Sequence, residues 1–276
     1  MPELPEVETI RLLLRNGGPE SPSLLNYEIT GADLYWDRTL ETPAPDEFKK
    51  KITSQRIEEI ERRGKFLNFS LSDFHFLLHL RMSGDVLIQP KTEPPGKHHR
   101  LSLNFKNGLK FSFIDPRKFG RAWLVKDPDL ILGNLGPEPL SVDFTPTYLH
   151  KALSSHKRQI KPLLMDQAFL AGLGNIYTDE ALFLAKIHPL TKSDQITNNQ
   201  SERLFQSIRF VLSEGIRKNG ASIDWVYRGG EFQNYFRIYS RKGERCIDCG
   251  DLIERVIVGQ RSTFICPTCQ PDPVVN

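Results

Sequence analysis

The sequence predicts an α+β protein: one helix with an antiparallel β-sandwich, then a helical region, then a small cysteine module on a β-hairpin. Three observations support this prediction. Apolar and polar residues alternate with strand periodicity from Tyr27 to about Leu124. The apolar period becomes helical after the glycine- and proline-rich segment Gly133–Pro139. All four cysteines lie between Cys246 and Cys269, in two C-x2-C pairs.

The N-terminal part is expected to hold one helix followed by strands. Val7, Ile10 and Leu14 repeat at helical spacing, which predicts an amphipathic helix over about Pro5–Arg15. The dipeptide Asn107-Gly108 between two alternating runs is a strong hairpin signal. Strands are therefore expected at residues 66–71, 74–80, 101–105 and 109–113, with an exposed loop at 89–99.

The C-terminal part is expected to be mostly helical before the cysteines. Thr145-Pro146 is a typical N-cap and first-turn pair. Apolar residues at helical spacing predict helices at 160–170, 176–186 and 201–218. The glycine-containing segment 220–233 is expected to be a loop, and 270–276 a frayed tail. The expected domain boundaries are 1–132, 145–235 and 236–272, with a linker at 133–144.

The composition is that of a soluble globular protein. The chain has 276 residues, of which 39% are hydrophobic and 26% charged, and this length allows two domains with separate cores. No apolar run approaches the ~20 residues of a membrane span, and the acidic N-terminus lacks the apolar region of a signal peptide. The net charge is only +3, so binding to a polyanion requires positive charges gathered on one face. Paired cysteines favour a metal in a reducing compartment over disulfides.

The first residues suggest a nucleophile. Removal of Met1 would leave Pro2 as a free secondary amine, and an α-amino group titrates near ~8, so a useful fraction is uncharged at neutral pH. Such an amine can attack an electrophilic carbon, for example a sugar C1′, and form a Schiff base. Glu3 could supply a proton. The alternative is a proline-rich helix start whose acidic residues favour the helix N-terminus.

The cysteine spacing is typical of a structural zinc site. Four thiolates in two C-x2-C pairs suit a tetrahedral Zn²⁺ on a β-hairpin. The predicted ligands are Cys246, Cys249, Cys266 and Cys269. A closed four-sulfur site leaves no position for a substrate, so the metal would be structural. Arg261 falls between the pairs, where a finger tip is expected, and is either a solvated charge or a phosphate contact.

Other segments combine features that suit a nucleic acid. Asn175 follows a glycine-containing turn as a good N-cap, and the amides of a helix N-terminus can hold a DNA phosphate. Arg117 and Phe119 share a turn after a strand, which suits a guanidinium that bonds an unpaired base and a ring that wedges a base stack. Met82 lies on a similar loop. The alternatives are a structural turn for the first, and buried core side chains for Phe119 and Met82.

Together these segments resemble the formamidopyrimidine-DNA glycosylase family, the Fpg/Nei group. The motifs occur in the family's order from Pro2 to Cys269: PELPEVET, RRGKFL, HLRMSG, DPRKFG, IKPLLMD, GNIY, QRSTF and the paired CxxC. The resemblance implies a bifunctional base-excision enzyme. It would remove oxidised purines (8-oxoguanine and formamidopyrimidines) from duplex DNA and then cut the strand by β,δ-elimination. It also implies a helix–two-turn–helix motif and one structural Zn²⁺ in a zinc finger.

The resemblance implies roles for individual residues. Pro2 looks like the nucleophile and Glu3 like the acid–base group that assists sugar-ring opening. Lys65 looks like the group that assists β-elimination, and Arg261 like the finger arginine that assists δ-elimination. A trio resembles the side chains that fill the gap left by a flipped nucleotide: Met82, Arg117 and Phe119. Further positions resemble family DNA contacts: His98, Lys157, Asn175 and Tyr177.

The chain departs from the family pattern at two places. Lys118 stands where a second arginine is common, which turns a bidentate phosphate contact into a point charge. Residues 221–225 and 229–231 differ from the loop associated with 8-oxoguanine capture. Two alternatives therefore stay open: an endonuclease VIII-like specificity for oxidised pyrimidines, and a non-catalytic DNA-damage-binding zinc protein. The main interpretation implies damaged double-stranded DNA as the partner of a monomer, without membrane contact, in a bacterial cytoplasm near the nucleoid.

Overall fold

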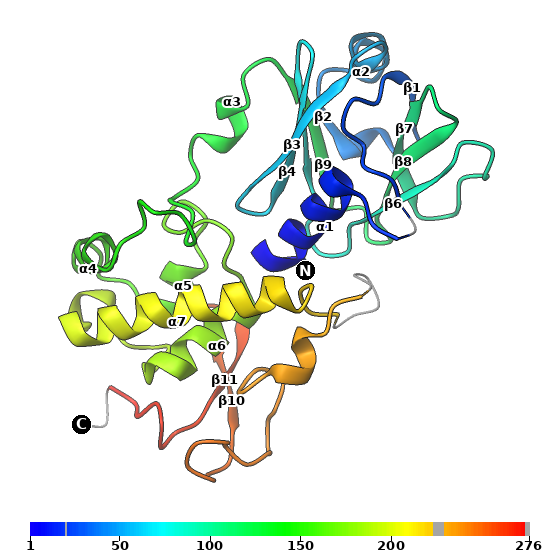
Figure 1. Cartoon of the computed structure of the whole chain (residues 1–276). Coiled ribbons are helices and arrows are strands. Elements are labelled where there is room, and N and C mark those ends of the chain that lie inside the picture. The colour runs from blue at the N-terminus through cyan, green and yellow to red at the C-terminus, as the bar shows by residue number, and fades with distance from the viewer. Residues whose placement is uncertain (20, 223–228, 274–276) are drawn as a thin grey trace. The chain divides into compact units, whose positions relative to one another are not determined.

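The computed structural model describes residues 1–19, 21–222 and 229–273 and divides into two compact units (Figure 1). Unit 1 is Met1–Asn134 with Ser222–Gly230, and unit 2 is Leu135–Ala221 with Glu231–Asn276. The predicted α+β class is confirmed, because unit 1 carries two β-sheets while unit 2 carries the longest described helix and a terminal hairpin. Part of the predicted loop at 220–233, namely 223–228, lies outside the described residues. No helix of the described chain is long and apolar enough to cross a membrane.

Two sheets form the sandwich of unit 1. The first has the order β1-β7-β8-β6 and comprises β1 (Ile29–Leu34), β7 (His99–Phe105), β8 (Leu109–Ile114) and β6 (Asp85–Pro90). The second has the order β2-β9-β5-β4-β3 and comprises β2 (Leu40–Thr42), β9 (Arg121–Val125), β5 (His75–His79), β4 (Phe66–Leu71) and β3 (Ile57–Arg63). All strand pairs are antiparallel except β2 and β9, which run parallel. The hairpin predicted around Asn107-Gly108 corresponds to β7 and β8, and the strands predicted at 66–71 and 74–80 correspond to β4 and β5.

Side chains from both sheets meet in one core. Phe69 of β4 and Phe111 of β8 are 1% and 0% exposed, and their rings lie edge to face with centroids 5.5 Å apart. Leu103 of β7 lies opposite Phe111 in the neighbouring strand. Aromatic pairs of this kind add to the free energy gained from burial. The alternation seen in the sequence therefore comes from residues that point into this shared core.

The helices of unit 1 are only partly as expected. The predicted helix is present as α1 (Leu4–Asn16), which buries Val7, Ile10 and Leu14 and packs against β3. Two short helices were not predicted: α2 (Pro45–Ile52) and α3 (Asp129–Leu132). In α2 only Phe48 and Ile52 are buried. One such pair is too little to establish a helical period in a lysine-rich segment.

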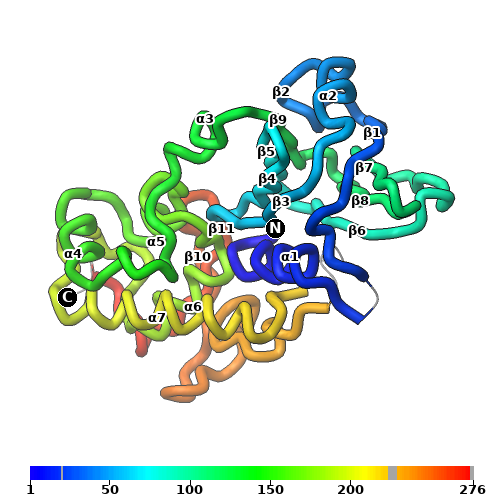
Figure 2. The backbone as a smooth tube through the Cα atoms, turned by 45° about the horizontal axis from the view of Figure 1, so that its top comes forward, coloured from blue at the N-terminus to red at the C-terminus, as the bar shows by residue number. Residues whose placement is uncertain are grey.

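Unit 2 is built from four main helices. They are α4 (Pro146–Ser154), α5 (Ile160–Leu164), α6 (Asn175–Ala185) and α7 (Asn198–Arg217), and α6 packs against α7 (Figure 2). Three single 3₁₀ turns complete the described helical elements: η1 (Asp37–Thr39) in unit 1, and η2 (Ser193–Gln195) and η3 (Phe232–Tyr235) in unit 2. Thr145 caps α4 as predicted, because its hydroxyl accepts a hydrogen bond from the Tyr148 amide at 3.1 Å.

The prediction of a helix over 160–170 is wrong in its length. The helix α5 ends at Leu164, and consecutive turns lead to α6. Side chains stabilise these turns in place of helical hydrogen bonds. The Asp166 carboxylate accepts from the Ala168 amide at 3.1 Å, and the Gln167 amide bonds the Leu173 carbonyl and the Gly172 N–H, each at 2.9 Å. Such local bonds compete with the helix and stop it early.

A small hairpin module ends the chain. The strands β10 (Glu254–Val258) and β11 (Arg261–Ile265) pair antiparallel between the two cysteine pairs. The module shares a core with α6 through Phe183. The expectation of a frayed tail from residue 270 is wrong for Gln270, which is 1% exposed and donates to the Ile187 carbonyl at 2.9 Å. The domain boundaries expected from the sequence stay a prediction.

Candidate active site and nucleic-acid interface

The N-terminal residues of unit 1 are held in place by the first turn of α1. Glu3 is the N-cap residue in extended conformation. Its amide donates to the Glu6 carboxylate at 2.7 Å, and the Val7 amide donates to the Glu3 carbonyl at 3.1 Å. Both Glu3 and Glu6 are only 2% exposed. The E-x-x-E spacing thus forms a capping box that fixes the backbone next to Pro2.

Lys65 lies in the tight turn between β3 and β4. Gly64 adopts φ +56°, a left-handed conformation that a residue without Cβ adopts without strain. Lys65 is 5% exposed. Arg62 ties this turn to α1, since its Nε donates to Glu8 at 2.9 Å and its Nη1 to the Gly64 carbonyl at 3.0 Å. The helix α1 and the turn that carries Lys65 are therefore joined within unit 1 by the ion pair between Arg62 and Glu8.

A buried histidine lies opposite this turn. His79 of β5 faces Phe66 of β4, with ring centroids 4.6 Å apart. Burial, together with the positive charges of Arg81 and Lys65, lowers the pKa of His79 to about 3. The ring is therefore neutral at neutral pH, and its Nδ1 accepts a hydrogen bond from the Arg81 amide at 3.0 Å. This contact fixes the start of the loop that carries Met82.

Four predicted DNA contacts lie on exposed loops of unit 1. Met82 is 37% and Phe119 45% exposed, and Arg117 and His98 are exposed as well. The Arg117 guanidinium lies 5.0 Å from the centre of the Phe119 ring, a distance that permits a cation–π contact. The alternative that Met82 and Phe119 are ordinary core residues is therefore excluded.

The predicted contacts on the helices of unit 2 differ in accessibility. Lys157 is exposed after α4. Asn175 is not the N-cap that the sequence suggested: Gly174 is the N-cap of α6 and Asn175 is the first helical residue. Its side-chain amide instead donates to the Ser262 carbonyl at 3.0 Å. Tyr177 is 0% exposed and stacks on Phe232 with centroids 5.2 Å apart, so its ring packs in the core, and its part in DNA binding stays a prediction.

Arg261 is the exposed first residue of β11, and a buried ion pair holds that strand. Lys161 and Asp179 are 0% and 1% exposed, with 2.6 Å between Nζ and Oδ1. Lys161 Nζ also donates to the Ser262 carbonyl at 3.2 Å, and the Phe264 amide donates to Asp179 at 3.1 Å. Burial raises the pKa of Asp179 and the charge of Lys161 opposes the rise, which leaves the pKa at about 7. The pair connects α5 and α6 to the finger strand.

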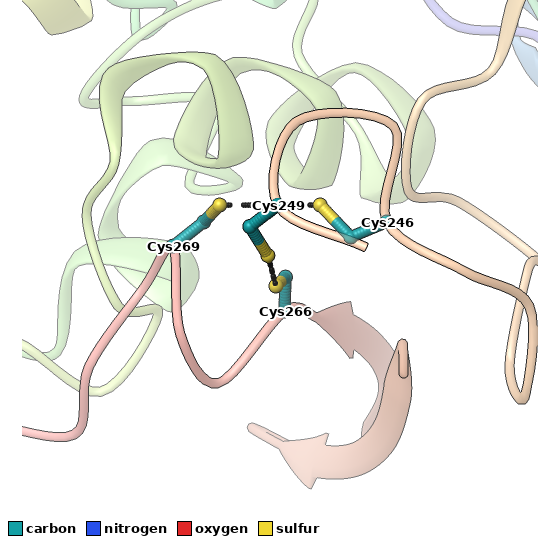
Figure 3. A group of neighbouring side chains, drawn as sticks. All are labelled: Cys246, Cys249, Cys266 and Cys269. Atoms are coloured by element: carbon teal, nitrogen blue, oxygen red, sulfur yellow. Dashed lines mark hydrogen bonds between the residues drawn. The ribbon is translucent and has the colours of Figure 1, made fainter. Parts of the chain in front are cut away.

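The four cysteines form a compact cluster of sulfurs. Figure 3 shows their side chains turned toward one another, and the four Sγ atoms lie within 4.8 Å of one another. The Sγ atoms of Cys249 and Cys266 are 3.4 Å apart, and those of Cys246 and Cys269 are 3.9 Å apart. Four sulfurs bound at ~2.3 Å to a tetrahedral zinc lie about 3.8 Å apart. The residues therefore fit one structural Zn²⁺.

The predicted site residues fall into two sets. Unit 1 holds Pro2, Glu3, Lys65, Met82, His98, Arg117 and Phe119, and unit 2 holds Lys157, Asn175, Tyr177, Arg261 and the cysteines. Sequence patterns did not assign supporting contacts to Glu6, Glu8, Arg62, Ser83 and Asp115, although the acidic residues near the N-terminus were expected to favour the start of a helix. One signal was available: an acidic residue three positions after an N-cap, as at Glu6, is typical of a capping box.

Comparison with protein families covers most of the chain. The model of the formamidopyrimidine-DNA glycosylase N-terminal domain matches residues 1–122. The model of the formamidopyrimidine-DNA glycosylase H2TH domain matches residues 135–226. The zinc finger found in FPG and IleRS matches residues 243–271. A β-sandwich, an H2TH domain and a zinc finger in this order define the class of the protein.

Relatives and solved structures extend the match over the full chain. The formamidopyrimidine-DNA glycosylases of Chloroflexus aurantiacus and Protochlamydia amoebophila are 45% and 41% identical, over 98% of this chain and 98% and 99% of theirs. The structure is similar to Lactococcus lactis Fpg (MutM) bound to N7-benzyl-Fapy-dG DNA, with TM-score 0.91, 35% identity, and 98% and 100% of the two chains covered. It is also similar to MutM bound to carbocyclic 8-oxo-G DNA, with TM-score 0.90, 35% identity and the same coverage. The chain belongs to the formamidopyrimidine-DNA glycosylase family.

Proposed function

We infer that this protein is a bifunctional DNA glycosylase and abasic-site lyase that removes oxidised purines from duplex DNA. The observation that carries the inference is the match over 98% of the chain to formamidopyrimidine-DNA glycosylases, one of which is 45% identical. Solved structures of similar chains hold DNA with formamidopyrimidine, 8-oxoguanine-type or abasic lesions. The substrate class that follows for this chain is 8-oxoguanine and formamidopyrimidines.

The chemistry begins at the N-terminus. After Met1 is removed, the Pro2 nitrogen forms a bond to C1′ of the damaged nucleotide while the bond from C1′ to the base breaks. The amine gives up its proton, and the departing base gains one. Glu3 donates a proton to the sugar-ring oxygen as the ring opens, which leaves an iminium ion. The iminium accepts electrons when a C2′ proton leaves. The 3′ phosphate and then the 5′ phosphate depart, assisted by Lys65 and Arg261. The capping box beneath Glu3 supports this assignment because it limits the positions available to both reacting groups.

The exposed loops of unit 1 would occupy the gap in the duplex. A base inside the stack cannot be attacked, so the damaged nucleotide must leave it, which costs a few kcal/mol. Met82 and Phe119 offer apolar exposed side chains, and Arg117 offers donors to an orphaned base. His98, Lys157 and Asn175 would hold the phosphates on either side. The zinc module keeps Arg261 in place and takes no part in the bond changes.

The same proposal defines the setting in which the protein acts. Its partner is damaged double-stranded DNA, and one chain is sufficient for the reaction. Its curated relatives include proteins from bacteria such as Bacillus cereus and Bacillus anthracis. The bacterial cytoplasm, at the nucleoid, is the compartment that matches this substrate and the unpaired thiols.

A panel of lesions tests the proposed function. Purified protein is incubated with duplexes that carry 8-oxoguanine or formamidopyrimidine opposite cytosine, or an oxidised pyrimidine. We expect excision of the purine lesions, and strand breaks with phosphate at both ends. Excision confined to oxidised pyrimidines would instead support the endonuclease VIII-like alternative. Binding without excision of any lesion, with Met1 removed, would support the non-catalytic alternative.

Arg117→Ala is expected to affect the choice of opposite base more than affinity. Its guanidinium lies at the tip of an exposed loop, suited to the edge of an orphaned cytosine, and such a contact contributes about 1–3 kcal/mol of discrimination. The ratio of excision rates opposite cytosine and adenine should therefore fall about tenfold or more. Lys51→Ala is a matched control, because Lys51 is also a cation over a ring, 5.7 Å from the centre of Phe74, and should leave the ratio unchanged. Equal wild-type rates opposite both bases would contradict this role.

Lys157→Ala and Arg261→Ala are expected to weaken binding to all DNA sequences alike. Both residues are exposed cations, and loss of one phosphate contact reduces the slope of log K against log salt by about one. Affinity is measured by titration at several salt concentrations. Lys106→Ala removes a cation whose side chain is 75% exposed at the β7–β8 turn, and it should keep the wild-type slope. An effect limited to one opposing base would contradict a phosphate contact.

A further inference from the structure

One buried carboxylate lies beneath both exposed loops of unit 1. Asp115, which follows β8, is 0% exposed. Its Oδ1 accepts hydrogen bonds from the Ser83 hydroxyl and, at 3.1 Å, from the Arg117 amide. Its Oδ2 accepts from the Gly120 amide at 2.7 Å. Because Ser83 adjoins Met82, and Phe119 adjoins Gly120, one side chain joins the two loops.

A direct hydrogen bond between Ser83 and Arg117 also joins the two loops. The Ser83 hydroxyl oxygen also accepts a hydrogen bond from the Arg117 amide, at 3.2 Å. Ser83 is 2% exposed, so water does not compete for these groups. The Arg117 backbone is thus held by both Ser83 and Asp115, directly below the guanidinium that the proposed function directs at a base.

The backbone of Asp115 fixes a third DNA-facing segment. Its amide donates to the His98 carbonyl at 2.9 Å. Its carbonyl accepts from Arg100 Nε at 2.7 Å, and Arg100 Nη1 donates to the Lys97 carbonyl at 3.2 Å. Arg100 is only 6% exposed. The segment with exposed His98 is therefore anchored at the same residue as both loops.

The two loops are closely packed where they join the core. A Cβ added to Gly84 would lie 2.4 Å from the Leu80 carbonyl oxygen, and one added to Gly120 would lie 2.2 Å from the Phe113 ring. Both loops thus leave the sandwich at points of close packing. Displacement of either tip would have to move core residues or break the hydrogen bonds to Asp115.

We propose that Asp115 is a positioning residue, which with Ser83 makes Met82, Arg117 and Phe119 act on DNA as one rigid probe. The proposal rests on the proposed function, in which these side chains enter the gap of a flipped nucleotide. A probe that inserts into stacked bases is pushed back by the duplex. The tips of two independent loops would be displaced by the duplex, whereas loops joined by a buried, charge-assisted hydrogen-bond network keep their positions. Asp115 touches no substrate and acts only through the loops.

Ser83→Ala tests the coupling with the smallest change. It removes the hydroxyl between the loops and keeps Asp115. Two quantities are measured: the ratio of single-turnover excision opposite cytosine and adenine, and the fluorescence of 2-aminopurine beside a tetrahydrofuran abasic analogue, which reports insertion. We expect the ratio to fall about tenfold and the insertion signal to drop. Affinity for undamaged duplex and its salt slope should stay as in the wild type, since phosphate contacts are retained.

Ser102→Ala is the matched control. Ser102 is also a fully buried serine of the sandwich, and its hydroxyl bonds Ser112 at 3.0 Å between β7 and β8. The control should lower the melting temperature and keep both the ratio and the insertion signal. If Ser83→Ala behaves in the same way as Ser102→Ala, the contact is merely structural and the proposal is overturned.

Asp115→Asn is a stronger second variant. It keeps the shape but replaces one acceptor oxygen by a donor, so the three donors around Asp115 can no longer all be satisfied, and a larger loss than for Ser83→Ala is expected. If this variant does not fold, Ser83→Ala alone decides. If the wild type excises no lesion, the proposed function is contradicted. The insertion signal needs no catalysis, so it would still test whether the two loops act as one rigid probe.

Discussion

Glu3→Gln is expected to bind lesion-containing duplex as tightly as the wild type and to lose base excision by about 100-fold or more, the range of a general acid–base group. Glutamine keeps the size of the side chain but cannot donate a carboxylic proton to the sugar oxygen. The backbone geometry should survive, because the Glu3 amide is held by Glu6 at 2.7 Å and the Glu3 carbonyl by the Val7 amide at 3.1 Å.

The measurement is single-turnover excision of 8-oxoguanine opposite cytosine, with affinity measured separately on an uncleavable abasic analogue. Glu58→Gln makes the same substitution at an exposed glutamate of β3 in the same unit and should change neither quantity. Excision by Glu3→Gln near the wild-type rate would remove Glu3 from the mechanism. A loss of binding equal to the loss of rate would show that the variant disturbs the site as a whole.

Loss of zinc should unfold the finger module and abolish tight DNA binding. The apolar core around β10 and β11 is small, and two of its six buried members are the ligands Cys246 and Cys266. A structural zinc contributes roughly 10–16 kcal/mol in comparable modules, far more than such a core provides. Without it, the strand that carries Arg261 would lose its position. Cys266→Ser is therefore expected to lose the metal and weaken DNA binding by about 100-fold or more, which corresponds to about 2.8 kcal/mol.

Elemental analysis of the purified wild-type protein should find one zinc per chain. In Cys266→Ser, amide exchange should show loss of protection in β10 and β11, with protection kept in unit 1. Thr268→Ala is the matched control, because Thr268 lies between two ligands but bonds Asp251 at 2.7 Å and should retain the metal. Active wild-type protein without zinc would contradict the account of this module.

The parts of the fold with repeated patterns could be predicted from the sequence. Val7, Ile10 and Leu14 face one core and so establish the period of α1. The residues around Asn107-Gly108 alternate because β7 and β8 pair across that turn. By contrast, α2 buries only Phe48 and Ile52. The end of α5 depends on how the Asp166 and Gln167 side chains bond nearby backbone groups, which no periodicity reveals.

Some residues of the candidate site could likewise be predicted from the sequence, and others could not. Residues with chemistry of their own, such as Pro2, Arg261 and the cysteines, stand out in the sequence by type and spacing. The residues that hold them in place do not stand out in this way. Asp115 belongs to a DPRKFG turn and reads as an ordinary turn residue, because its partner Ser83 is distant in the sequence. Tyr177 shows the reverse case: its motif suggests a surface contact, but the ring is fully buried against Phe232.

The proposed mechanism requires a covalent bond between the Pro2 nitrogen and the damaged nucleotide. The direct test is borohydride trapping with duplex that carries 8-oxoguanine opposite cytosine, followed by peptide mapping of the adduct. With Met1 removed, we expect a trapped adduct on Pro2. A version that retains an extra N-terminal residue should give none, because its Pro2 nitrogen is a tertiary amide, and Pro2→Gly should keep weak lyase activity through its primary amine. An adduct on an internal lysine such as Lys65, or no adduct with any lesion despite removal of Met1, would contradict the account.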